Sequence, residues 1–169
     1  MKILMISGSA RKKSSNLLLL SAIGEMFEDQ HDFIYFNDLA DFPLFTPEKL
    51  DKGVPSPVKE FKNLLTEADA VIISTPEYTH NIPAVLKNML EWCTHSGEFE
   101  HKPVLPITFT PQEPRGKYAM QSLLFSLKTM KAHVAVEMSL YKTDVSIEKE
   151  SMLLSEDLRS IVKEAIEML

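Results

Sequence analysis

Short apolar runs alternate with longer amphipathic stretches along the chain. The short runs are Ile3–Ile6, Phe33–Phe36, Ala70–Ile73, Val104–Phe109 and His133–Val136. Continuous apolar runs of this length are typical of parallel strands that are covered on both faces of a sheet. The pattern therefore predicts five buried strands.

Apolar residues spaced by three and four predict a helix after each of these runs. Ser14, Ser15 and Asn16 offer N-cap side chains to the first helix, and Pro83 suits the first turn of the third. In chain order, the predicted helices cover Leu17–Phe27, Val58–Leu65, Val85–Trp92, Tyr118–Met130 and Leu154–Leu169. The proline-containing stretch from Asp38 to Pro57 is predicted to be a long loop.

Five strands alternating with five helices predict parallel βαβ units, and hence an open α/β sheet of order 2-1-3-4-5 with helices on both faces. In such a sheet, ligands bind beyond the carboxyl ends of the strands, where successive connections leave in opposite directions. This point falls after the first and third strands. We therefore expect the binding site at the loops that begin at Ser7 and Thr75.

Composition narrows the class of protein. The 169 residues, 44% of them hydrophobic, fit a single domain over residues 1–169. The net charge of −6 argues against nucleic acid or anionic lipid as a partner of the whole surface. No apolar run approaches the roughly 20 residues of a membrane span, and the run at the N-terminus is shorter than the core of a signal peptide. A lone Cys93 forms no internal disulfide, so we expect a cytoplasmic protein.

The first loop, residues 7–16, combines small residues, hydroxyls, an amide and three cations. Backbone N–H groups at the helix start, the hydroxyls and Arg11 would surround a phosphate dianion. A run of charges is usually a solvated surface, which accounts for Lys12 and Lys13. It does not account for the spacing of Gly8, Ser9, Arg11, Ser14 and Asn16. Because the Walker and G-x-G-x-x-G patterns are both absent, we expect a mononucleotide as the ligand.

Two motifs resemble those of the NADPH-dependent FMN reductase family, which includes flavin, quinone and azo-dye reductases. The family pattern G-S-x-R-x-x-S-x-N is met by Gly8, Ser9, Arg11, Ser14 and Asn16. A second pattern, close to P-E-Y-N-x-S-x-P-G-x-L-K-N-x-x-D-W, is met by Pro76, Glu77, Tyr78, Pro83, Leu86, Lys87, Asn88 and Trp92. Thr79, Asn81, Ala84 and Glu91 depart from it.

The resemblance implies a flavodoxin-like three-layer sandwich with a five-stranded parallel sheet, and it assigns roles in binding FMN. It implies that the phosphate is bound by Ser9, Arg11, Ser14, Ser15 and Asn16. It implies that the second loop, residues 76–81, holds the isoalloxazine ring. Pro76, Glu77, Tyr78 and Thr79 would contact the ring, and His80 and Asn81 would lie near its exposed edge. Contacts to the flavin edge are expected from Thr110, Gln112 and Gly116 of the third loop, residues 110–116, where Pro111 and Pro114 replace the glycines usual in the family.

No residue looks like a protein-based nucleophile. Cys93 follows a helical stripe and reads as a small buried hydrophobe. No metal site is expected, because the histidines lack the close i, i+4 pairing of a helical site. The chemistry would therefore come from a cofactor.

The resemblance implies an FMN-dependent oxidoreductase that takes a hydride from NADPH or NADH. It would then reduce a small acceptor, such as a quinone, an azo compound, free flavin or a metal ion, by a ping-pong mechanism. The family also implies a homodimer or homotetramer. Two alternatives stay open, namely a flavodoxin-type electron carrier and a flavin-free binding module on the same fold. The apolar segment Phe42–Phe45 is read as a cover for the ring, as a subunit interface or as an ordinary packed loop.

Overall fold

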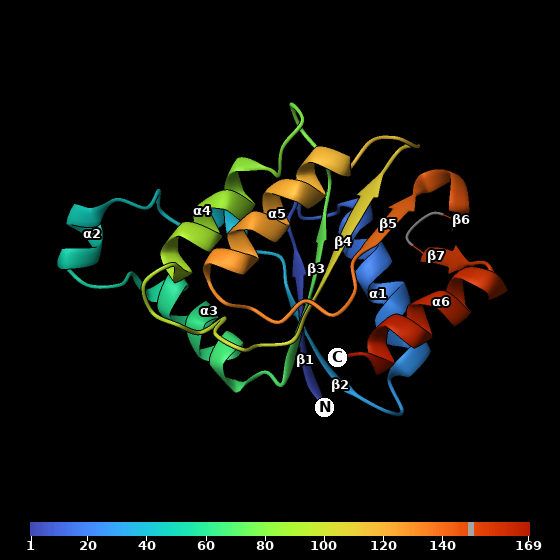
Figure 1. Ribbon diagram of the computed structural model, residues 1–169, viewed down its shortest axis with the longest axis horizontal. Helices are drawn as coiled ribbons and strands as arrows, with labels where there is room; N and C mark the ends of the chain where they lie inside the picture. The colour runs from blue at the N-terminus through green and yellow to red at the C-terminus, as the bar shows by residue number, and fades with distance from the viewer. Residues whose placement is uncertain (149–150) are drawn as a thin grey trace.

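A five-stranded parallel sheet forms the centre of the protein (Figure 1). The structure, a computed structural model, describes residues 1–148 and 151–169. The strands are β1 (Lys2–Ser7), β2 (Asp32–Phe36), β3 (Ala70–Thr75), β4 (Val104–Thr110) and β5 (Met138–Tyr141). They lie in the order β2-β1-β3-β4-β5, and every neighbouring pair is parallel. The predicted strand order is confirmed.

Helices cover both faces of this sheet. One face carries α1 (Ser15–Phe27) and α6 (Glu156–Glu167), and the other carries α3 (Ser56–Glu67), α4 (Ala84–Cys93) and α5 (Lys117–Thr129). Alternate residues of β1 belong to different core clusters, as the two-residue period of a strand requires. All residues of β3 and β4 are buried, which explains why both strands are predominantly apolar. Within the described residues, no helix has the length and apolar character needed to cross a bilayer.

The segment predicted as one long loop contains two short helices. The 3-10 helix η1 spans Leu39–Asp41, and α2 spans Pro47–Asp51. Thr46 caps α2, because its hydroxyl accepts a hydrogen bond from the backbone N–H of Lys49 at 3.3 Å. In Figure 1, α2 stands apart from the other helices at the left of the view. Helix propensity and the Thr46 cap are local signals of a helix, but the prolines of this segment led to the prediction of a loop.

The segment Phe42–Phe45 is mostly a packed loop. The Pro43 carbonyl accepts hydrogen bonds from Asn88 Nδ2 at 3.1 Å and from Trp92 Nε1 at 2.8 Å. The Phe45 ring packs edge-on against Trp92, with 5.1 Å between ring centroids. Only Leu44 extends into solvent, with 68% of its surface exposed. These contacts favour the packed-loop reading over a cover for a bound ring.

The predicted position of the fifth strand was wrong. His133 makes only an isolated bridge to Pro103, and the strand β5 begins at Met138, opposite Ile107 in the carboxyl half of β4. Ala132, Val134 and Val136 lie in the connection before β5 and pack against the core. They are hydrophobic because they are partly buried, although they do not belong to a strand.

The structure also contains an unpredicted 3-10 helix and hairpin after β5. They are η2 (Lys142–Asp144), β6 (Val145–Glu148) and β7 (Ser151–Leu154). As a result the last helix begins at Glu156, after the N-cap Ser155, and not at Leu154 as predicted.

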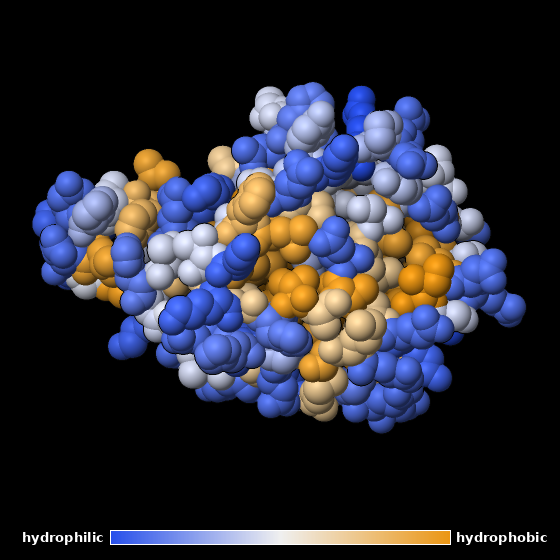
Figure 2. Space-filling view, in the orientation of Figure 1, coloured by the Kyte–Doolittle hydropathy of each residue, from blue (hydrophilic) through white to orange (hydrophobic). Residues whose placement is uncertain are grey.

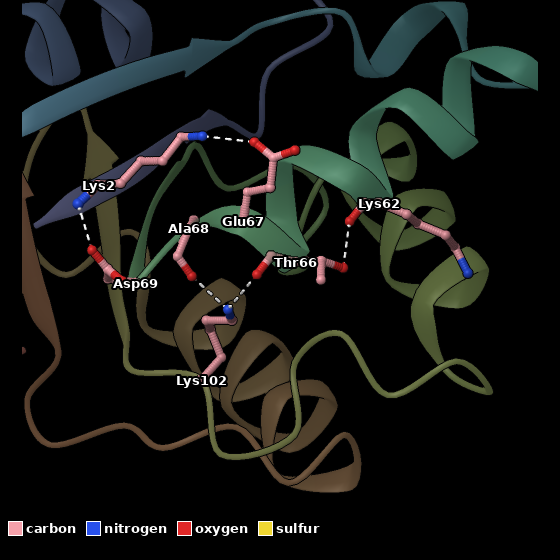
Figure 3. A network of polar contacts seen from close by, with 7 residues as sticks. All are labelled: Lys2, Lys62, Thr66, Glu67, Ala68, Asp69 and Lys102. Carbon is pink, nitrogen blue, oxygen red and sulfur yellow. Dashed lines mark hydrogen bonds and ion pairs between the residues drawn. The ribbon is translucent and has the colours of Figure 1, made fainter.

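A polar network at the amino-terminal end of the sheet fixes the entry into β3 (Figure 3). The backbone N–H of Lys2 donates to Asp69 Oδ2 at 2.7 Å, and Lys2 Nζ lies 2.7 Å from Glu67 Oε2. Lys102 Nζ donates to the Ala68 carbonyl at 2.5 Å, at the end of α3. A cation here satisfies carbonyls that the helix leaves without partners. The network therefore joins β1 and Lys102, which precedes β4, to the connection between α3 and β3.

Candidate functional site

Gly8 brings the first loop directly against β3. Its N–H donates to the Ser74 carbonyl at 2.8 Å. A Cβ atom at this position would lie 2.9 Å from Leu86 Cδ2 and 3.0 Å from Thr75 Oγ1, closer than side chains pack. The close approach thus requires glycine.

The start of α1 is held in place by its own polar side chains. Ser14 is the N-cap, and its hydroxyl accepts the Leu17 N–H at 3.1 Å and lies 3.2 Å from Ser7 Oγ. Asn16 is 3% exposed, and its Oδ1 accepts a hydrogen bond from Ser74 Oγ at 2.7 Å, which directs Nδ2 to other acceptors. No acidic residue lies in the first turn. The positive end of the helix dipole is therefore available to an anion.

The second loop is a tight hairpin turn. Tyr78 and Asn81 exchange backbone hydrogen bonds of 2.9 and 3.0 Å. The two residues between them, Thr79 and His80, have φ angles of 49° and 56°. Non-glycine residues seldom adopt this left-handed conformation, which costs about 1–2 kcal/mol per residue. The turn consequently depends on contacts that hold it.

Glu77 supplies such a contact by capping α5. Its Oε2 accepts the backbone N–H groups of Tyr118 and Ala119, both at 3.0 Å. The N-cap Gly116 has no side chain to do so. The other carboxylate oxygen lies 3.6 Å from His80 Nδ1, and the side chain of Glu77 is only 8% exposed. Glu77 thus anchors the second loop to α5, and its carboxylate has little left to offer a ligand.

The first two loops meet at a cavity of about 210 Å³ beyond the carboxyl ends of the strands. It is lined by Ser9, Arg11, Ser14, Ser15 and Asn16 of the first loop and by Pro76, Glu77 and Tyr78 of the second. Thr79 and Asn81 line a different hollow beside Pro83 and Lys87. The His80 side chain is 77% exposed. The structure therefore brings together all the predicted phosphate residues and the first half of the predicted ring residues.

The third loop contributes different residues from those that the resemblance implied. Thr110 is buried, and its hydroxyl donates to the Arg115 carbonyl at 3.0 Å. The Gln112 carbonyl accepts the Arg115 N–H at 3.1 Å. Gly116 has a φ of 100°, and a Cβ there would lie 2.8 Å from Thr108 Oγ1. Thr110, Gln112 and Gly116 thus shape the loop without lining the cavity.

Four residues that sequence reasoning missed complete the wall. They are Phe109, Pro111, Arg115 and Lys142. The first three follow from the predicted end of β4, because carboxyl ends of parallel strands share one edge of the sheet. Lys142 had no such signal, because the strand before it was predicted to begin at His133, whereas it begins at Met138.

Cys93 does not line this cavity. Cys93 is 1% exposed within the core, and burial raises the pKa of its thiol to about 12. Such a thiol stays protonated at neutral pH and is a poor nucleophile. Within residues 1–148 and 151–169, no group of three or more His, Cys, Asp or Glu side chains could hold a metal ion.

Comparison with known proteins points to one family. The model of the family described as NADPH-dependent FMN reductase matches residues 1–143. An NADPH azoreductase of a Bacillus species is 32% identical over 127 residues, which cover 75% of this chain and 68% of that protein. The NADH-dependent flavin reductase subunit 2 of Lactobacillus johnsonii is 40% identical over 92 residues, 54% of this chain and 48% of that one. The matched part thus spans about half the length of some relatives.

Solved structures share the fold. The structure of FerB, described as a flavoenzyme NAD(P)H:(acceptor) oxidoreductase from Paracoccus denitrificans, superposes with a TM-score of 0.82. The alignment covers 99% of this chain and 96% of that one at 21% identity. At this identity the likeness establishes the architecture, which agrees with the predicted α/β sandwich.

Proposed function

This chain belongs to the NADPH-dependent FMN reductase family, and we propose on that basis that it binds FMN and acts as an NAD(P)H-dependent oxidoreductase. The observation that carries the proposal is the composition of the cavity wall. The wall combines the positive start of α1 and Arg11 with the largely apolar residues Pro76, Tyr78 and Phe109. A cofactor with a phosphate at one end and a flat aromatic ring at the other fits this combination.

The first loop would hold the phosphate. Ser9, Arg11, Ser15 and Asn16 line the same cavity. They would offer the phosphate their hydroxyls, the guanidinium, the side-chain amide and the backbone N–H groups at the start of α1. Ser14 acts mainly by capping the helix, which keeps those N–H groups in position. Charged hydrogen bonds of this kind contribute about 1.5–3 kcal/mol each.

The second loop would hold the ring. Pro76 and Tyr78 present apolar surface to the cavity, while Glu77 keeps their backbone in place through its contact with α5. Tyr78 is 53% exposed, so its ring has a free face to present to a planar ligand. Bound FMN supplies the two-electron chemistry between a nicotinamide and an acceptor. The role of the chain is to orient the ring and leave one face open to each substrate in turn, which gives ping-pong kinetics.

Quinones, azo compounds, free flavin and metal ions are all acceptors in keeping with an exposed flavin.

Two measurements on purified protein test the proposal. First, the ligand released on denaturation should have the mass and absorbance spectrum of FMN, or added FMN should bind with a dissociation constant in the micromolar range or below. Second, NADPH or NADH should bleach the bound flavin under nitrogen, and a quinone should restore its colour. A chain that binds no FMN refutes the proposal, and one that is coloured but not bleached is an electron carrier instead.

We further propose a cytoplasmic homodimer or homotetramer. Leu44 and Phe125, at 68% and 73%, are the most exposed large apolar side chains among the described residues. Figure 2 shows further hydrophobic atoms gathered between α5 and α6. Sedimentation equilibrium distinguishes an oligomer from a monomer of 19.2 kDa.

A further inference from the structure

Three cations without ion-pair partners line the cavity. They are Arg11, Arg115 and Lys142, and across the described part of the chain no carboxylate lies within ion-pair distance of any of them. Lys2 and Lys131, by contrast, are paired with Glu67 and Glu100, both at 2.7 Å. Glu77, which also lines the cavity, is already engaged by α5. The cavity therefore carries a local excess of positive charge.

These cations fall into two groups along the edge of the sheet. Arg11 follows β1, whereas Arg115 follows β4 and Lys142 follows β5. Neighbouring strands lie about 4.8 Å apart, so two to three strand spacings put roughly 10–14 Å between the ends of β1 and those of β4 and β5. A single phosphate at the start of α1 can be met by Arg11. Arg115 and Lys142 lie on the side toward which the rest of such a ligand would extend.

The backbone of the third loop has few N–H groups for a ligand. Pro111 and Pro114 have none, and the N–H of Arg115 is already bonded to the Gln112 carbonyl at 3.1 Å. Negative charge on a ring beside this loop would therefore meet few amide donors. The exposed side chains of Arg115 and Lys142 are the positive groups on this side of the cavity wall.

We propose that Arg115 and Lys142 set the reduction potential of the bound flavin by stabilising the negative charge that its ring gains on reduction. The inference rests on the proposed binding of FMN. A hydride that leaves NAD(P)H takes two electrons and one proton to the ring, releases NAD(P)⁺ and adds one negative charge. Two nearby cations favour the charged product over the neutral oxidised ring. They raise the potential without being needed to retain the cofactor.

The test compares Arg115→Gln, Lys142→Gln and the double variant with the unaltered protein, each loaded with FMN. Lys117→Gln is the matched control, because Lys117 is exposed, lies two residues from Arg115 and does not line the cavity. Arg11→Gln removes the cation at the proposed phosphate end of the cavity. Three quantities are measured: the two-electron midpoint potential against reference dyes, the affinity for sulfite, which adds to the ring and leaves it negatively charged, and the dissociation constant of oxidised FMN.

We expect the double variant to bind sulfite about tenfold more weakly and to lower the reduction equilibrium constant about tenfold, equivalent to about 30 mV for a two-electron couple. Its affinity for oxidised FMN should change less than threefold, which also shows that the site is folded. Lys117→Gln should leave all three quantities unchanged. Arg11→Gln should weaken FMN binding at least tenfold and change the potential little.

Unchanged potential and sulfite affinity in the double variant would refute the inference while leaving the proposed function intact. A loss of FMN affinity equal to that of Arg11→Gln, with the potential unchanged, would also refute it and would assign both cations to the phosphate. Failure of the unaltered chain to bind FMN would refute the proposed function and this inference together.

Discussion

The carboxylate of Glu77 offers a sharp test of how the second loop is held in place. In the Glu77→Ala variant, the N–H groups of Tyr118 and Ala119 lose their acceptor. Loss of an N-cap costs about 0.5–2 kcal/mol, and loss of a negative charge at a partly buried helix start costs up to about 2 kcal/mol. Because both figures describe the same contact, we expect a total loss of about 2 kcal/mol.

The assay is unfolding of the cofactor-free protein in urea and by heat at pH 7. A loss of this size should lower the Tm by about 4–8 °C in a chain of this length. Glu77→Gln keeps an acceptor oxygen and should recover about half of the loss, about 1 kcal/mol. Glu91→Gln is the control, because it removes a carboxylate whose surface pair with Lys87, at 3.0 Å, contributes only about 0.3–0.5 kcal/mol.

The second loop should respond in the same order. Thr79 and His80 hold left-handed backbone conformations, so a loop released from α5 should relax toward other conformations. FMN affinity should therefore fall more in Glu77→Ala than in Glu77→Gln, and not at all in Glu91→Gln. Equal unfolding midpoints for Glu77→Ala and Glu91→Gln would show that the capping contact contributes nothing to stability, and the reasoning would fail.

Three further predictions concern the first loop and the core. Arg11→Ala and Ser9→Ala should each weaken FMN binding about tenfold or more, by loss of about 1.5–3 kcal/mol per charged hydrogen bond, while the domain stays folded. Fluorescence titration measures the affinity, and unchanged affinity in both variants would contradict the phosphate assignment. Gly8→Ala should lower stability by about 1–3 kcal/mol and weaken FMN binding, since the added methyl group would meet Leu86 at 2.9 Å; a stable variant with normal affinity would contradict it. Burial raises the pKa of Cys93 to about 12, so the thiol should not react with a thiol reagent at pH 8 until the protein is unfolded. The free energy of unfolding should fall as the pH rises above the ordinary thiol pKa, because only the unfolded chain ionises there. Rapid labelling of the native protein would contradict this prediction.

The sequence alone predicted the parts of the fold that follow from hydrophobic periodicity. The runs that became β1, β3 and β4 are predominantly apolar because those strands are covered on both faces. Periodicity failed at the fifth strand, since Val134 and Val136 are apolar within a connection. A hydrophobic residue shows that its position is covered, but does not show whether its backbone pairs with a neighbouring strand.

The candidate site divides in the same way. The first-loop part of the cavity wall was predictable because its residues follow one another along the chain, and local order places them on one turn. The capping of α5 by Glu77 joins residues 41 and 42 positions apart, and no local pattern encodes such a contact. Arg115 and Lys142 reach the same cavity only because β4 and β5 end side by side. Sequence periodicity thus determined which segments form the sheet, while the lateral order of the strands decided which charges share the cavity, because that proximity exists only once the sheet has assembled.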